Sequence, residues 1–148
     1  MGSSFTEFRG FGFWSRDQLL ETWLELLAEV VPADAPGWLR EAEQHWRMQA
    51  RAGFQGCVNA DLDARLTSDD RIETVLALTE QASAYAARLA AQTGKLPADW
   101  LNTRGVGGEG TVWPRDLELE SVRQVANALT ALLRGNLQTT AKTSPVLH

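Results

Sequence analysis

The sequence predicts an all-α fold: a compact bundle of four main helices preceded by an extended aromatic arm. Three observations support this prediction. Four stretches repeat apolar residues at the spacing of one helix face. Each stretch is bounded by a capping side chain, a glycine or a proline. Strand-like patterns are confined to two short aromatic stretches, which form at most a minor two-stranded pairing.

We expect three parts in the 148-residue chain. Residues 1–14 form the extended arm, because glycines interrupt the aromatic residues too often for a helix. Residues 15–135 form a single helical domain that is long enough to bury a sizeable core. Residues 136–148 are polar and irregular, so we expect a flexible C-terminal tail. Residues 111–113 have a pattern similar to that of the arm, and any strand pairing is expected between these two stretches.

The first helix is predicted to start at Ser15 and to end at Val31. Ser15 and Gln18 have the spacing of a capping box, in which two side chains satisfy N–H groups at the helix start. Pro32 ends the run, because it disfavours the helical conformation at the residue before it. The core face of this helix carries large apolar side chains at helical spacing, namely Leu19, Leu20, Trp23, Leu24, Leu27, Val30 and Val31.

Four carboxylates line the opposite side of this helix, each four residues from the next. They are Asp17, Glu21, Glu25 and Glu29, and they are referred to below as the acidic ridge. Like charges at this spacing repel by about 0.2–0.5 kcal/mol per pair. The acidic ridge is therefore predicted to be either a solvated face or a docking surface for a basic protein partner.

The second helix is predicted over residues 34–53 and places two polar side chains among tryptophans. At about 100° of rotation per residue, His45 and Gln49 fall on the face that carries Trp38 and Trp46. Buried polar groups require hydrogen-bond partners, so these residues belong either to a satisfied core network or to a site. The opposite face, toward water, carries Arg40, Arg47 and Arg51.

A polar site on this helix would combine His45 and Gln49 with Glu41 and with Arg16 or Arg115. Glu41 lies one turn before His45 and has the spacing needed to orient its ring. Such a site would bind a small ligand or perform catalysis, and it predicts a pocket that reaches solvent beside the tryptophans.

The connection after the second helix has a weak calcium-loop pattern. Asn59, Asp61 and Asp63 alternate, and Asp70 stands at the position of the last ligand. Ala64 replaces the glycine that such a loop requires. Turn and capping chemistry therefore explains these residues better than a metal site.

The third helix is predicted over residues 68–92 and the fourth over residues 117–134. The irregular stretch between them carries glycines that match a GxGxxG pattern, but neither a strand before it nor a helix directly after it is evident. Arg104 and Arg115 flank the Gly105–Gly110 loop, whose backbone N–H groups could hold an anion. A flexible connection is the favoured alternative.

Composition limits the class of function. A net charge of -5 argues against nucleic acid as a ligand. A single cysteine, Cys57, excludes an internal disulfide and fits a reducing compartment, so a cytoplasmic location is expected. No apolar run has membrane-spanning length. Two histidines and the absence of cysteine pairs predict no metal centre, and no cofactor is expected.

The sequence carries none of the motifs of the common catalytic classes, so an enzyme is the less expected class. We predict a small acidic protein-binding domain, for example an immunity-type protein that neutralises a basic toxin or enzyme partner through the acidic ridge. One alternative is a small-ligand-binding or catalytic domain around His45 and Gln49. The other is a structural homodimer in which tryptophans of two copies bury each other.

Overall fold

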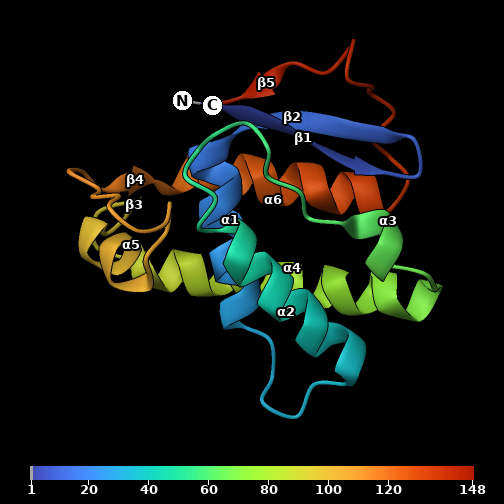
Figure 1. Cartoon of the computed structure of the whole chain (residues 1–148), viewed down its shortest axis with the longest axis horizontal. Coiled ribbons are helices and arrows are strands. Elements are labelled where there is room, and N and C mark those ends of the chain that lie inside the picture. The colour runs from blue at the N-terminus through green and yellow to red at the C-terminus, as the bar shows by residue number, and fades with distance from the viewer. Residues whose placement is uncertain (1) are drawn as a thin grey trace.

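The computed structural model describes residues 2–148, which form six helices and two small sheets (Figure 1). The prediction of an all-α fold is wrong, because these residues include five strands. Met1, the first residue of the expected arm, lies outside the described residues. The elements in chain order are β1 (Ser3–Phe8), β2 (Phe11–Arg16), α1 (Asp17–Glu29), α2 (Gly37–Gln49), α3 (Leu62–Arg65), α4 (Asp69–Leu89), β3 (Lys95–Leu96), α5 (Ala98–Arg104), β4 (Leu117–Glu118), α6 (Leu119–Leu133) and β5 (Val146–Leu147).

The expected aromatic arm is a β-hairpin that pairs with itself. β1 and β2 are antiparallel, and their register sets Phe5 opposite Trp14. The two turn residues, Arg9 and Gly10, have φ angles of 52° and 87°, as type I′ hairpin turns require. The strand pairing expected between the arm and residues 111–113 is not found in the described chain, where that stretch is irregular.

β2 continues directly into α1, and this displaces the predicted capping box. Ser15 lies within β2, and α1 begins at Asp17. The backbone N–H of Asp17 donates to the carbonyl of Gly2 at 3.0 Å. The Ser15 hydroxyl is buried and has no hydrogen-bond partner within residues 2–148. The predicted N-cap is therefore wrong, because the strand extends past it.

The C-terminal residues form hydrogen bonds with the hairpin. β5 pairs in parallel with β2, so the larger sheet has the order β1-β2-β5 and the helices cover one of its faces (Figure 1). The Gly12 N–H donates to the carbonyl of Thr139 at 2.9 Å. The indole N–H of Trp14 donates to the carbonyl of Ala141 at 2.8 Å. The stretch expected to be a flexible tail thus completes the sheet.

The four longest helices, α1, α2, α4 and α6, match the four predicted helical stretches within a few residues. Their apolar faces form one core with the inner face of the hairpin, and Trp23 and Trp46 are each 1% exposed there. α1 contacts α2, α4 and α6 as well as the sheet. A helix with neighbours on all sides has little room for a solvated face, and this determines where the acidic ridge lies.

Gly12 is the hairpin position where a side chain is least tolerated. A Cβ at Gly12 would collide with the carbonyl oxygen of Thr6 and would lie 2.6 Å from the Phe5 ring. A Cβ at Gly10 meets nothing within 4 Å, so Gly10→Ala carries mainly the cost of its positive φ. We expect losses of at least about 2 kcal/mol for Gly12→Ala and about 1 kcal/mol for Gly10→Ala in urea unfolding. Equal losses would contradict this packing.

Candidate functional site

The acidic ridge is turned into the molecule. Asp17, Glu21 and Glu25 are each 0% exposed, and the Glu29 side chain is 18% exposed. The expectation of a solvated or docking ridge is therefore wrong. The connection between α2 and α3, together with arginines of α2 and α5, covers the ridge.

Asp17 joins β1 to the α2–α3 connection. Its Oδ1 accepts a hydrogen bond from the Ser4 hydroxyl at 2.6 Å. Its Oδ2 accepts the backbone N–H of Gly56 at 2.5 Å. The Ser4 hydroxyl oxygen in turn accepts the N–H of Val58 at 3.0 Å. A buried carboxylate and a buried hydroxyl therefore hold two main-chain N–H groups of the connection.

Glu21 holds the start of the connection with both of its oxygens. Oε1 accepts the N–H of Gly53 at 3.1 Å, and Oε2 accepts the N–H of Phe54 at 2.8 Å. Both donors have positive φ, 81° and 59°. Burial raises the pKa of Glu21 to about 7, although these two N–H groups lower it and the nearby Asp17 carboxylate raises it.

Glu25 and Glu29 are paired with arginines of the same chain. Glu25 accepts hydrogen bonds from Nη1 of Arg47 and Nη2 of Arg51, each at 2.8 Å. Glu29 lies 3.0 Å from Nη1 of Arg104 and 3.7 Å from Nη1 of Arg47. Burial raises the pKa of Glu25, while Arg51 and Arg47 lower it. The ridge thus binds its own fold and leaves no free negative strip for a partner.

His45 and Gln49, the core of the predicted polar site, hold a single residue of the same connection. His45 Nε2 lies 2.8 Å from the carbonyl oxygen of Asn59, so this nitrogen carries the proton and donates it. Gln49 Oε1 accepts the N–H of Asn59 at 2.7 Å. Both side chains are therefore engaged in fixing main-chain atoms.

The two arginines proposed for the polar site lie elsewhere. Arg16 is at the end of β2, where its Nε donates to Nδ1 of His148 at 2.7 Å. Arg115 lines a separate hollow of about 370 Å³ with Gln18 and Trp113. Of the predicted set, the structure brings together only the α2 residues, Glu41, His45 and Gln49.

An open groove of about 390 Å³ runs along the outer side of α2. It is lined by Glu41, Gln44, His45 and Met48 of α2 and by Arg65 of α3. Met48 is 63% exposed. Arg65 Nε is buried without a hydrogen bond in the described chain and lies 3.8 Å from Oδ2 of Asp61.

Met48 and Arg65 were not among the site residues predicted from the sequence. The four α2 residues of the groove are spaced three, one and three positions apart, which is one stripe of a helix. This stripe could have been found by noting that Met48 is the one large apolar residue on it.

Three backbone N–H groups of the Gly105–Gly110 loop are bonded to main-chain carbonyls. The N–H groups of Gly105, Gly107 and Gly108 donate to the carbonyls of Asn102, Ala50 and Gly105, at 3.2, 2.8 and 3.0 Å. These donors are therefore occupied, and the geometry does not favour an anion site. The Asn59 carboxamide oxygen accepts the N–H of Asp61 at 2.8 Å, which is turn chemistry. The Asp63 carboxylate accepts the N–H of Arg9 at 2.9 Å and so joins α3 to the hairpin turn.

No protein-family model, no curated protein and no solved structure matches this chain. Within residues 2–148, no helix is both long and apolar enough to cross a bilayer. The same residues contain no group of three or more His, Cys, Asp or Glu side chains arranged to hold a metal ion.

The raised pKa of Glu21 predicts a pH-dependent stability. With a folded pKa of about 7 against a reference of 4.5, the folded protein retains a proton that the unfolded chain has released. The contribution of Glu21 to stability is full below the reference pKa and is lost as pH rises through the folded pKa.

Glu21→Gln removes this titration, so the stability of the variant relative to wild type should increase by up to about 3 kcal/mol between about pH 5 and pH 8. Urea denaturation measures this, with Glu80→Gln at an exposed site as control. Parallel pH profiles of wild type and Glu21→Gln would contradict the raised pKa.

Arg51→Met should destabilise the protein more than Glu25→Gln. Removing Arg51 leaves the buried Glu25 carboxylate with one cation instead of two. Neutralising Glu25 leaves Arg47 and Arg51 side chains that are 35% and 38% exposed and stay hydrated. We expect losses of about 3 kcal/mol and about 1 kcal/mol respectively in the free energy of unfolding, measured at alkaline pH. The opposite order would mean that Glu25 does not need its charge neutralised by arginine.

Proposed function

We propose that this chain is a protein-binding domain whose binding surface is the end formed by α2, α3 and the start of α4. The observation that carries this proposal is the 63% exposure of Met48 in an open groove beside Arg65. Met and Arg are enriched in protein interfaces, and flexible Met side chains adapt to partner surfaces. An open groove with mixed chemistry suits a protein partner better than a small ligand, which needs an enclosing pocket.

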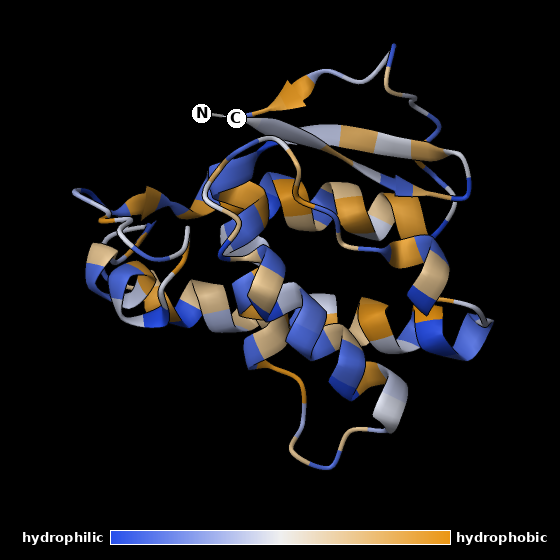
Figure 2. Ribbon diagram, viewed as in Figure 1, coloured by the Kyte–Doolittle hydropathy of each residue, from blue (hydrophilic) through white to orange (hydrophobic). Residues whose placement is uncertain are grey.

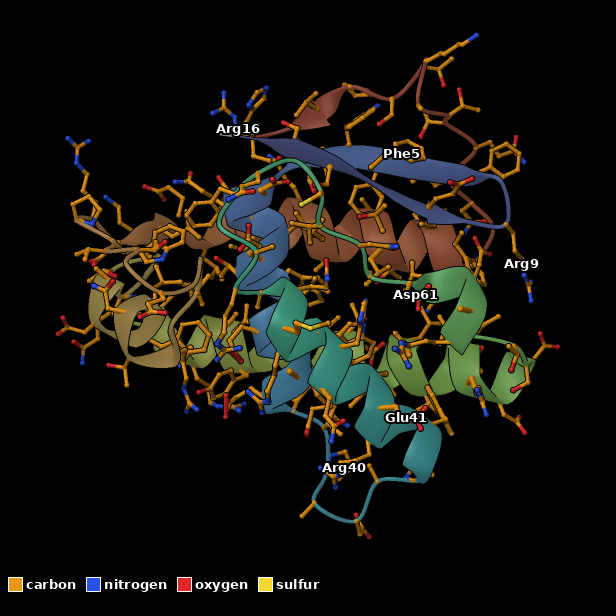
Figure 3. All side chains as sticks on the ribbon, in the orientation of Figure 1. Phe5, Arg9, Arg16, Arg40, Glu41 and Asp61 are labelled. Carbon is orange, nitrogen blue, oxygen red and sulfur yellow. The ribbon has the colours of Figure 1, made fainter. Side chains whose placement is uncertain are left out.

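The charge of this end favours a basic partner. Carboxylates outnumber the arginines around the groove, and the start of α4 is blue in the hydropathy view (Figure 2). Figure 3 shows Glu41 and Asp61 at the same end of the molecule. The acidic residues are Glu41, Asp61, Asp63, Asp69, Asp70 and Glu73, and the arginines are Arg9, Arg65, Arg71 and Arg134. Arg40, beside Glu41, forms an ion pair with Glu43. Complementary charge of this kind favours rapid association and selects against acidic proteins.

A second groove adjoins this surface, and side-chain contacts hold its elements together. A hollow of about 360 Å³ lies between α4, α6 and the hairpin turn, and Asp69, Glu73 and Arg9 are among its lining residues. The guanidinium of Arg71 lies 4.8 Å from the centre of the Trp38 ring. Together with the bonds of His45 and Gln49 to the connection, this contact limits the ordering cost of binding.

The proposed role is the one predicted from the sequence, but the binding surface is a different one. An immunity-type protein is the specific form of the proposal in which the partner is a basic toxin or enzyme. The acidic ridge is buried and cannot serve as its docking surface. A cytoplasmic location is part of the proposal, and the exposed free thiol of Cys57 supports it. The geometry does not favour the small-ligand alternative, because His45 Nε2 and the Gln49 oxygen, which would bind the ligand, are already bonded to Asn59.

Met48→Glu tests the proposal, with Val112→Glu as a matched control. Val112 is 76% exposed and lies outside both grooves. The three full-length proteins are used side by side as bait in an extract of the source cells, and captured proteins are quantified by mass spectrometry. We expect a basic protein that wild type and Val112→Glu capture equally and that Met48→Glu captures about tenfold less.

The captured protein is then purified and its Kd for each bait is measured by calorimetry. The Kd should increase about tenfold with Met48→Glu and should also increase with salt. Equal binding to all three baits, or a partner without excess positive charge, would overturn the proposed surface.

A further inference from the structure

The outer face of the larger sheet presents one apolar row between two polar rows. The register sets Phe5 of β1, Trp14 of β2 and Val146 of β5 side by side across the strands. The Phe5 and Trp14 rings meet edge to face with centroids 5.4 Å apart. Val146 is 37% exposed, and Phe5 and Trp14 are half-buried. These side chains point away from the helices, which therefore do not cover them.

The polar rows on either side of this apolar row carry opposite charges. One row holds Glu7 opposite Gly12, and the other holds Ser3 opposite Arg16. Glu7 and Arg16 are both exposed, and neither forms an ion pair within residues 2–148. The one side-chain partner of Arg16 in these residues is His148, whose Nδ1 accepts a hydrogen bond from its Nε at 2.7 Å. They stand at opposite ends of the hairpin. Figure 3 shows Arg16 at one end, with Phe5 between it and the turn at Arg9.

We propose that this face packs against the same face of a second copy of the chain. A two-fold axis along the apolar row places Phe5 and Trp14 of one copy on their counterparts in the other. The same axis exchanges the two polar rows, so each Glu7 faces the end of the partner sheet that carries Arg16. The residues that directly face these long side chains are Ser3 and Gly12, which are small. The face is therefore complementary to itself in charge and in shape.

A second copy explains this pattern better than an unrelated partner. An acid and a base placed symmetrically about an apolar row satisfy each other only when the same surface meets itself across a two-fold axis. The C-terminal segment borders the face on the side of β2, through the bond from Trp14 to Ala141. The contact is therefore centred on β1 and β2.

The size of the face determines how strong the association is. β1 and β2 have six residues each and β5 has two. At about 3.4 Å per residue and about 5 Å between strands, the three strands offer roughly 240 Å² per copy. Stable complexes bury about 800 Å² per partner. The dimer is consequently weak and forms at high protein concentration.

Charge reversal with rescue tests this inference in sedimentation equilibrium from about 10 µM to about 1 mM. Wild type should increase in mass from 16.3 kDa toward twice that value. Glu7→Arg and Arg16→Glu should each weaken the dimer about tenfold, because each places like charges across the axis at two symmetric points. The double variant Glu7→Arg/Arg16→Glu should restore the wild-type Kd to within about threefold.

Glu80→Arg is the control, because Glu80 is exposed on α4 and its reversal changes the net charge as Glu7→Arg does. Circular dichroism shows whether each variant is folded, and the two single reversals replace each other if one is not. A mass of 16.3 kDa at every concentration would overturn the inference. A dimer that Glu80→Arg weakens as much as Glu7→Arg, or that the double variant fails to restore, would also overturn it.

Discussion

The inward orientation of four carboxylates on α1 is the constraint on which the rest of this structure depends. A carboxylate that leaves water must be given donors or cations in return. The donors come from the Ser4 hydroxyl in β1, from backbone N–H groups between α2 and α3, and from arginines of α2 and α5. One helix therefore fixes the positions of the hairpin, the connection and two further helices at once. Its central place in the core follows from the same requirement, since its apolar side is also buried.

The α2–α3 connection links the buried ridge to the exposed groove. At its start it is bonded to Glu21 through Gly53 and Phe54, and further on it is bonded to His45 and Gln49 through Asn59. Two of its non-glycine residues, Phe54 and Asp61, have φ angles of 59° and 55°. Such conformations cost about 1 kcal/mol or more each and persist only where the surroundings impose them. His45, which lines the groove, is thus bonded to a connection that is itself anchored on the fully buried Glu21 carboxylate.

The four longest helices could be predicted from the sequence, because each buries one face. The apolar residues of that face recur every three or four positions along the sequence. The hairpin was missed because the signal is two residues long, Arg9 and Gly10, and the composition around it resembles irregular chain. The orientation of the acidic ridge could not be predicted at all. Whether Glu25 faces water or arginine depends on how α1 and α2 pack, and the helical phase alone placed Arg47 and Arg51 toward solvent.

The candidate site was likewise predictable from the sequence only in part. The sequence singled out His45 and Gln49 as polar residues that need partners, and the structure supplies them. It could not show that both partners are main-chain atoms of Asn59, because that contact joins residues on separate segments. Met48 was passed over because an isolated exposed methionine has meaning only beside the groove that α3 completes.

The buried acids hold the α2–α3 connection by its main chain, and this has a consequence for how relatives of the chain would diverge. Every residue except proline offers the same N–H, so the exposed side chains at positions 55 and 57 are free to vary without loss of these bonds. Phe54 and Val58 are constrained in addition by their packing against Trp113 and in the core. The carboxylates of α1, Arg47 of α2 and Arg51 just after the end of α2 have no such freedom. A distant homologue would be recognised by that acid and arginine signature.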